Sequence, residues 1–156
     1  GPGTTLQKGY YWIRAVASPN FHKYLQTKPA YQPGIALIES YTTAGQFQIV
    51  SGQLAELVSA PGAAEEFLYA NVAQTKTHDG RTLAVSFNTT KNDYGTWAWS
   101  GDALTWSAPD QQRPNAAAHY VCQGQQLFIN LGAYLYNWPS GCADQTIHYY
   151  NDAKAN

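Results

Sequence analysis

One pattern recurs three times along the chain and limits its fold more than any other feature: apolar alternation, a short polar turn with glycine, then leucine and renewed alternation. It covers residues 47–54, 97–104 and 120–127, which read FQIVSGQL, WAWSGDAL and YVCQGQQL. Alternation sends successive side chains to opposite faces of a strand, and glycine permits the backbone conformation of a tight turn. Convincing amphipathic helix patterns are absent from the sequence. The pattern therefore predicts three antiparallel hairpins in an all-β fold.

Further strand candidates lie around these hairpins and bring the total to about eleven short strands. They are residues 10–17, 22–27, 35–42, 66–73, 82–88, 128–131, 134–137 and 145–150. Many short strands with turns rich in glycine and proline are typical of a β-sandwich or β-barrel. Three crude units, 10–58, 66–107 and 117–151, each contain one hairpin. A single-domain β-barrel is predicted, and a β-trefoil would explain the threefold rhythm, although the spacing of the hairpins is uneven.

The chain of 156 residues has the size of one domain. We expect an N-terminal tail at 1–9, a single β domain at 10–151 and a C-terminal tail at 152–156, with both tails frayed. Gly1 and Pro2 have the form of a protease scar, and the sequence contains no methionine. A processed protein that has lost a signal peptide is therefore expected.

The charge and the length of the apolar runs limit the kinds of partner that this chain can bind. Charged residues make up 12% of the chain and its formal net charge is -1, so no basic excess exists to neutralise phosphates. The apolar run at 30–38, interrupted by Pro33 and Gly34, is far shorter than the roughly 20 residues that cross a bilayer. These features predict no nucleic-acid partner and no membrane insertion. Together with the expected loss of a signal peptide, they fit a secreted, extracellular or cell-wall protein.

Cys122 and Cys142 are the two cysteines of the chain. We favour a structural disulfide, with two buried free thiols as the alternative. Closing a loop of this length stabilises a fold by about 3 kcal/mol on the chain-entropy model. Asn88, followed by Thr89 and Thr90, forms a glycosylation sequon, which also fits an exported protein.

Residues suited to catalysis are few and scattered. His22, His78, His119 and His148 have no metal-ligand spacing, so no metal and no cofactor are predicted. The nearest nucleophile arrangement, Cys142 with Asp144 and His148, loses its thiolate if Cys142 is oxidised. Asp79 and Asp102 fall in predicted turns, where aspartate belongs for local hydrogen bonding. No catalytic residue is assigned, and the protein is predicted not to be an enzyme.

Aromatic residues are in surplus, with five tryptophans, twelve tyrosines and five phenylalanines. Alternation places Trp97 and Trp99 on one face of their strand, where we expect them in the core. The consecutive run that begins with Tyr10 and Tyr11, and the pair Tyr149 and Tyr150, must send some rings outward. Because such rings suit stacking on sugars or contact with proteins, these four tyrosines are the candidate ligand-binding residues.

Several of these pieces, in order, resemble the PhiA-type cell-wall protein family of filamentous fungi. They are YWIRAVA at 11–17, residues 21–25, QFQIVSGQL at 46–54, GTWAW at 95–99, LTW at 104–106, Cys122, and Gly141 with Cys142. Typical members carry further cysteines near the N-terminus, which this chain lacks. The resemblance implies a wall or apoplastic protein, with an effector or elicitor of plant defence among the related roles. It implies no catalytic residues.

Three other functions stay open. A carbohydrate-binding, lectin-like module is the main alternative. A β-trefoil protease inhibitor would insert a loop such as 108–118, which contains Arg113 and Pro114. A hydrolase or nuclease would need histidines and carboxylates that cluster in the fold. The partner expected for the leading function is a cell-wall polysaccharide or a host surface protein.

Overall fold

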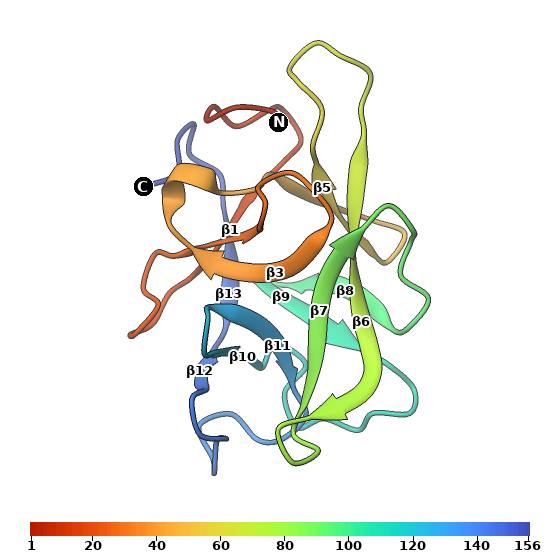
Figure 1. Cartoon of the computed structure of the whole chain (residues 1–156), viewed down its shortest axis with the longest axis vertical. Coiled ribbons are helices and arrows are strands. Elements are labelled where there is room, and N and C mark those ends of the chain that lie inside the picture. The colour runs from red at the N-terminus through yellow and green to blue at the C-terminus, as the bar shows by residue number, and fades with distance from the viewer.

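The computed structural model describes residues 1–156 and is all-β, as predicted (Figure 1). Its one helical segment, η1, is a three-residue 3-10 turn at Tyr41–Thr43, so no helix in it could span a bilayer. The strands are β1 Trp12–Ala15, β2 Tyr24–Thr27, β3 Gly34–Glu39, β4 Phe47–Val50, β5 Gln53–Leu57, β6 Phe67–Thr77, β7 Thr82–Asn88, β8 Thr96–Ser100, β9 Ala103–Ser107, β10 His119–Cys122, β11 Gln126–Asn130, β12 Ala143–Gln145 and β13 Ile147–Tyr150.

The strands form one antiparallel sheet that curls into a nearly closed barrel. Its order is β4-β5-β6-β7-β11-β3-β2-β1-β13-β9-β8, with β10 paired to β11 and β12. The two ends of this path approach each other, because the Trp97 N–H donates to the Gly52 carbonyl oxygen at 2.9 Å. Tyr11 and Phe47 also exchange two backbone hydrogen bonds of 2.8 Å, which join the start of β1 to β4. These contacts bring the two ends of the sheet together without pairing β4 with β8.

All three predicted hairpins are present as β4–β5, β8–β9 and β10–β11. Gly52 and Gly124 have φ values of 76° and 82°, in the left-handed region that the predicted turns require. The hairpins occupy unequal places in the strand order. Two lie at the ends of the path and β10–β11 lies within the sheet.

A core of 21 buried residues fills the barrel. Trp97 and Trp106 are 1% and 0% exposed, and their indole N–H groups donate to the carbonyl oxygens of Ala70 and Tyr94. The prediction of a buried Trp97 is therefore confirmed. Trp99 points to the same face of β8 but is half-buried at the margin of the core, so the expectation that it is a full core residue needs correction. It lies near the end of the strand, where its ring meets surface tyrosines.

The predicted strand at 134–137 is absent, and the segment forms turns instead. Leu135 and Asn137 have φ values of 59° and 50°, which no strand accommodates. Alternating apolar residues suggested a strand, but the local backbone follows contacts made with β6–β7 and β12.

The two tails are also better ordered than expected. The Leu6 N–H donates to the Ala153 carbonyl oxygen at 2.9 Å, and the Trp12 indole N–H donates to the Asp152 carbonyl oxygen at 2.9 Å. The C-terminal segment is further held where the Tyr24 hydroxyl donates to the Asn156 carbonyl oxygen at 3.0 Å. The two tails therefore pack beside each other and against the barrel.

Candidate functional site

The segment 132–141, which we call the aromatic loop, presents three large apolar side chains to solvent. Leu135, Tyr136 and Trp138 are 63%, 68% and 56% exposed. A large apolar side chain gains about 1.5–3 kcal/mol when it is fully buried, so three of them close together in sequence offer a substantial driving force for association. Tyrosine and tryptophan are also the residue types most enriched at binding hot spots. The aromatic loop therefore has the composition of a recognition surface.

Arg81 fastens the middle of the aromatic loop from the turn between β6 and β7. Its guanidinium donates to the carbonyl oxygen of Asn137 at 2.6 Å, to that of Tyr136 at 3.2 Å and to the Tyr120 hydroxyl at 3.3 Å. Gly132 makes room for this group, because a Cβ atom there would lie 2.5 Å from the Arg81 Nη2 atom. One side chain thereby satisfies two loop carbonyl groups that strand pairing leaves open.

Asp144, in β12, supports the start of the aromatic loop through Asn130. Asp144 is 6% exposed, and its Oδ1 accepts a 2.9 Å hydrogen bond from the Asn130 side-chain amide. The Asn130 Oδ1 in turn accepts from the Gly132 N–H at 2.8 Å. Burial raises the pKa of Asp144, and the nearby Leu135 backbone, the Asn130 amide and the positive charge of Arg81 oppose that rise. The buried carboxyl group is thus coupled to the loop backbone at Gly132 through Asn130.

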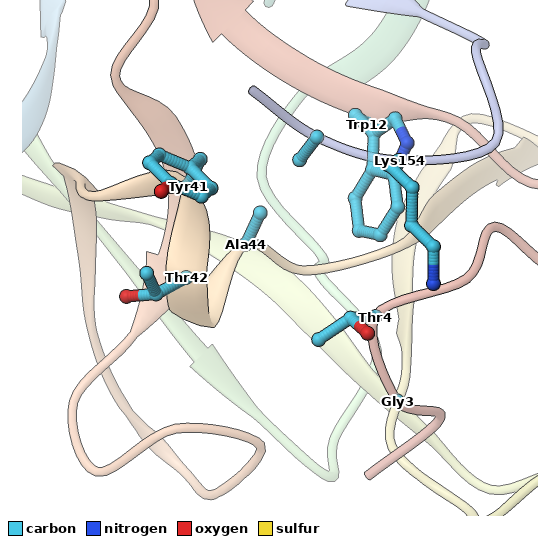
Figure 2. A pocket seen from close by; sticks show the side chains of 8 residues that line it. Gly3, Thr4, Trp12, Tyr41, Thr42, Ala44 and Lys154 are labelled. Atoms are coloured by element: carbon cyan, nitrogen blue, oxygen red, sulfur yellow. The ribbon is translucent and has the colours of Figure 1, made fainter.

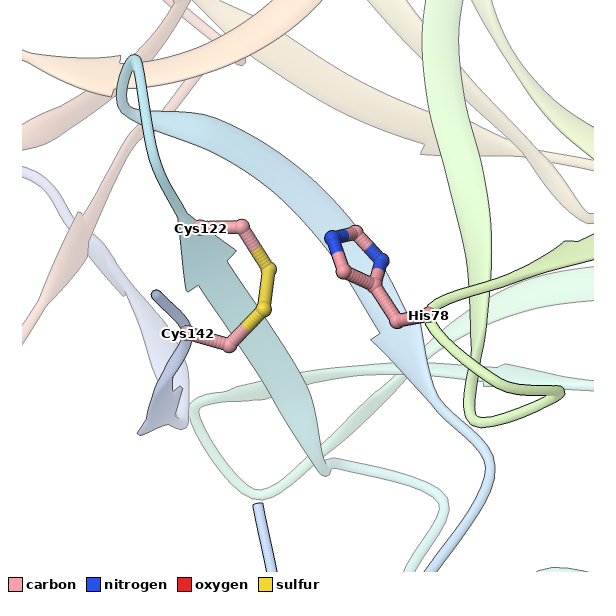
Figure 3. Close-up of side chains that lie close together, drawn as sticks. All are labelled: His78, Cys122 and Cys142. Atoms are coloured by element: carbon pink, nitrogen blue, oxygen red, sulfur yellow. A yellow bond between two sulfur atoms is a disulfide. The ribbon is translucent and has the colours of Figure 1, made fainter. Parts of the chain in front are cut away.

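The disulfide between Cys122 and Cys142 closes the C-terminal end of the aromatic loop, and it confirms the predicted pairing. Cys122 ends β10, and Cys142 directly precedes β12, which pairs with β10. His78 lies beside the two sulfur atoms (Figure 3). Arg81, Asp144 and the disulfide together restrain the backbone of the loop that carries the exposed side chains.

A second aromatic group, formed by Tyr11, Trp99 and Tyr149, contains two of the four predicted ligand-binding tyrosines. Ring centroids are 4.8 Å apart for Tyr11 and Tyr149, 5.9 Å for Tyr11 and Trp99, and 5.3 Å for Trp99 and Tyr149. All three side chains are half-buried. Tyr11 also lines an open groove of about 400 Å³ whose polar groups include Gln7 and Asn151. Aromatic faces beside amide groups suit a sugar ring.

The other two candidate tyrosines lie differently. Tyr10 is 7% exposed and its hydroxyl donates to Glu65, so the expectation of an outward ring at this position needs correction. Burial, followed by the Glu65 carboxylate, raises the pKa of Tyr10. The Tyr150 ring is covered on one side by the Arg14 guanidinium, whose central carbon lies 3.6 Å from the ring centroid. Neither ring joins the Tyr11, Trp99 and Tyr149 group.

Asn88 ends β7 with its side chain in a local turn. Its Oδ1 accepts hydrogen bonds from the Thr90 N–H at 2.8 Å and from the Asn71 side-chain amide at 3.3 Å. The side chain is half-buried. The amide nitrogen that would carry a glycan makes no hydrogen bond in the structure.

Two histidines differ in their capacity for acid–base chemistry. His119 is fully buried, and burial, then the nearby charge of Arg113, lowers its pKa to about 3 despite a hydrogen bond with the Ala117 carbonyl oxygen. His148 Nδ1 lies 2.9 Å from Asp102 Oδ1, and its Nε2 lies 3.0 Å from Thr146 Oγ1. This order of groups is that of a hydrolase triad. It lies on open surface, however, where Asp102 is 59% exposed, and none of the five main cavities reaches it.

A cavity of about 350 Å³ separates η1 from the two chain termini (Figure 2). Its wall includes the nearly buried Trp12 ring and the exposed Tyr41. The Lys154 ammonium at its rim already donates to the Thr5 hydroxyl at 2.7 Å. Because its lining holds no histidine and no carboxylate, this cavity offers no acid–base pair.

Glu56 is the most deeply buried carboxyl group. It is 0% exposed, and neither of its oxygen atoms has a hydrogen-bond partner. Burial raises its pKa to about 8. It faces Phe47 across the β4–β5 pair and lines none of the five main cavities, so it concerns stability and not a binding site.

Arg113, the cation of the proposed inhibitor loop, turns inward. Its guanidinium donates to the carbonyl oxygens of Trp106, Ala116, Ala118 and Asn130. Burial lowers its pKa to about 10. A side chain held by four carbonyl groups is not presented for insertion into a protease pocket.

Sequence reasoning missed the aromatic loop because its alternation was interpreted as a strand. The missed residues are Leu135, Tyr136 and Trp138, with Arg81 and Asp144 as their supports. The available signal was the set of turn-forming residues on either side of them. Gly132 precedes the tyrosines, and Pro139, Ser140 and Gly141 follow Trp138. Searches of protein-family models, curated proteins and solved structures found no match to this chain.

Proposed function

We propose that this chain is a secreted, non-enzymatic recognition protein of the fungal cell wall or the plant apoplast, which acts by binding a host surface protein through its aromatic loop. The observation that carries the proposal is the exposure of Leu135, Tyr136 and Trp138 on a loop that Arg81, Asp144 and the disulfide restrain.

Restraint favours binding because association otherwise has to order the loop. Immobilising a flexible side chain on binding costs about 0.5–1.5 kcal/mol, and ordering backbone costs more. Here the Tyr136 and Asn137 carbonyl groups are already hydrogen-bonded to Arg81. The loop can therefore present its apolar side chains to a partner with little further loss of backbone freedom.

A protein partner is favoured by the mixture of side chains. Leu135 is an aliphatic residue as exposed as its aromatic neighbours, and an aliphatic side chain has no flat face for a sugar. Tryptophan and tyrosine act as anchors in protein interfaces. The resemblance to secreted fungal wall proteins supports the same setting, because some small proteins of that kind trigger plant defence.

The proposal is tested by infiltrating purified protein into leaves and measuring the defence response against concentration. A Tyr136→Ser and Trp138→Ser double variant should raise the concentration for half-maximal response by on the order of a thousandfold, since each lost anchor costs about 2 kcal/mol and every 1.4 kcal/mol is tenfold. A Phe21→Ser and Tyr41→Ser variant is the matched control, because these rings are 60% and 53% exposed elsewhere. An unchanged response in the loop variant would overturn the proposal.

The same two variants should be mixed with insoluble chitin and β-glucan. Retention of the wild type, lost in the loop variant, would replace the protein partner by a wall polysaccharide at the same surface. Measurable turnover of a wall polysaccharide by the wild type would instead contradict the non-enzymatic proposal.

A lectin-like function is the second candidate, favoured by the Tyr11, Trp99 and Tyr149 group beside its groove. A glycan panel tests it with Tyr11→Ala, for which Tyr41→Ala is the control. Glycan binding that is lost with Tyr11→Ala and kept in the aromatic-loop variant would assign the binding to this second surface.

A further inference from the structure

The disulfide at the base of the aromatic loop has an imidazole beside it. His78 lies in the turn between β6 and β7, and one of its ligand atoms and the two cysteine sulfur atoms all lie within 4.8 Å of one another. Figure 3 shows a ring nitrogen of His78 on the side that faces the sulfur atoms. Cys122 and Cys142 are 5% and 8% exposed, so the cluster is largely shielded from solvent.

Neighbouring residues hold the His78 ring in this place. Its Nδ1 lies 2.7 Å from the Thr82 hydroxyl oxygen, and its ring packs edge-on against Phe128 with centroids 4.9 Å apart. The Nε2 atom makes no hydrogen bond within the protein. When Nδ1 donates its proton to the Thr82 hydroxyl oxygen, Nε2 is free to act as a ligand, and an acceptor on the other ring nitrogen is what orients histidine ligands in metal sites. The φ of His78 is 52°, so the turn adopts a backbone conformation uncommon for histidine.

We propose that reduction of the Cys122–Cys142 bond converts this cluster into a zinc site, with two thiolates and the His78 imidazole as protein ligands and water as the fourth. In the oxidised protein the sulfur atoms are bonded to each other and cannot act as thiolates. Two thiolates and an imidazole suit Zn²⁺ better than hard cations such as Mg²⁺ or Ca²⁺.

The chemistry balances with a dithiol as reductant. The dithiol supplies two electrons and two protons and becomes a disulfide, while Cys122 and Cys142 become thiols. Zinc binding then releases both thiol protons to solvent. Two Zn–S bonds of about 2.3 Å at a tetrahedral angle place the sulfur atoms about 3.8 Å apart. In the oxidised protein the sulfur atoms are bonded to each other, so reduction has to let them separate to that distance while His78 stays within reach.

The site would preserve the base of the aromatic loop under reducing conditions. Cys142 ends the loop segment that Arg81 and Asp144 restrain, so loss of the disulfide frees one of three restraints. A metal ion shared by Cys122, Cys142 and His78 would tie β10, the loop end and the β6–β7 turn together. This inference does not depend on which partner the loop binds.

Cobalt serves as a spectroscopic probe for the zinc site. The full chain is reduced with a phosphine, freed of it under anaerobic conditions and titrated with cobalt chloride. One equivalent should give sulfur-to-cobalt charge-transfer absorption and the visible bands of a four-coordinate ion, and zinc should abolish both. The oxidised protein should give neither signal.

His78→Gln should weaken cobalt binding by on the order of tenfold or more, because one of three protein ligands is lost. Thr82→Val should weaken it by about tenfold through loss of ring orientation. His22→Gln is the matched control, since His22 is also half-buried with a left-handed φ of 56°. It should bind cobalt like the wild type.

Folding of the reduced chain is followed in the same samples by circular dichroism and tryptophan fluorescence. A reduced protein without the cobalt bands would overturn the proposal. So would equal affinity in the wild type and His78→Gln, which is the result expected if metal binds to the thiols of an unfolded chain.

Discussion

The Arg81 guanidinium donates a hydrogen bond of 2.6 Å to the carbonyl oxygen of Asn137, far along the chain from it, and thereby fixes the aromatic loop to the turn between β6 and β7. Asn137 has a left-handed φ of 50°, a conformation that asparagine tolerates better than most residues, and the Arg81 hydrogen bond holds its carbonyl group in that turn. The contact holds the backbone of the aromatic loop while its large apolar side chains stay exposed to solvent.

Arg81→Ala should release the aromatic loop while the barrel stays folded. The change removes three hydrogen bonds from a charged donor, and we expect a loss of about 1–3 kcal/mol, at the low end because the guanidinium is partly solvated. Chymotrypsin should then cut faster after Leu135 or Tyr136, whereas Pro139 protects the bond after Trp138. Arg81→Lys keeps the charge without the planar fork and should give an intermediate rate. Equal cleavage of the wild type and Arg81→Ala would show that Arg81 does not restrain the loop.

Trp97→Ala should lower the free energy of unfolding more than Trp99→Ala, because Trp97 lies in the core and Trp99 at its margin. Trp97 is 1% exposed and donates to the Ala70 carbonyl oxygen, so its loss should reduce the free energy of unfolding by about 3–5 kcal/mol. Trp99 is half-buried against Tyr11 and Tyr149, and its loss should cost about 1–2 kcal/mol. Urea denaturation of both variants measures the difference. A Trp99 variant as unstable as the Trp97 variant would contradict this placement.

Glu56 should make stability fall as pH rises. Its folded pKa is about 8 against an ordinary 4.5, because burial disfavours the charged form. The folded state therefore keeps a proton that the unfolded state releases, and the free energy of unfolding should decrease by about 1.4 kcal/mol per pH unit between pH 4.5 and 8. The contribution is fully present below this window and lost above it.

Glu56→Gln removes the titrating group and should flatten that part of the stability profile. The exposed Glu66, changed to Gln, is the control and should leave the slope as in the wild type. Urea midpoints measured across the pH window report the slope. A Glu56→Gln profile as steep as that of the wild type would show that other groups cause it.

His148→Ala should leave the proposed recognition function intact. The Asp102, His148 and Thr146 contacts lie on open surface, so removing them should change stability by less than about 1 kcal/mol. The leaf response of His148→Ala should follow the wild-type concentration curve. Loss of the response in a folded His148→Ala or Thr146→Ala protein would indicate hydrolytic chemistry at this group instead.

Local patterns determined much of the fold. Alternation and turn glycines predicted the β4–β5, β8–β9 and β10–β11 hairpins, because side-chain direction along a strand and the backbone of a tight turn are set by neighbours in sequence. The same reasoning predicted the burial of Trp97 and favoured the Cys122–Cys142 disulfide. These features depend on a few adjacent residues or on a pair with no other partner.

Only the tertiary structure decided which of the candidate side chains are exposed and which are buried. Residues 134–137 alternate like a strand, but Arg81, Asp144 and the disulfide hold them as turns, and those contacts come from distant parts of the chain. Tyr10 and Tyr11 are neighbours in sequence, yet one ring is buried against Glu65 and the other joins Trp99 and Tyr149. Glu56 reads as an ordinary carboxylate until strand pairing buries it. At these positions exposure depends on which distant segments cover the side chain, and local sequence does not encode those contacts.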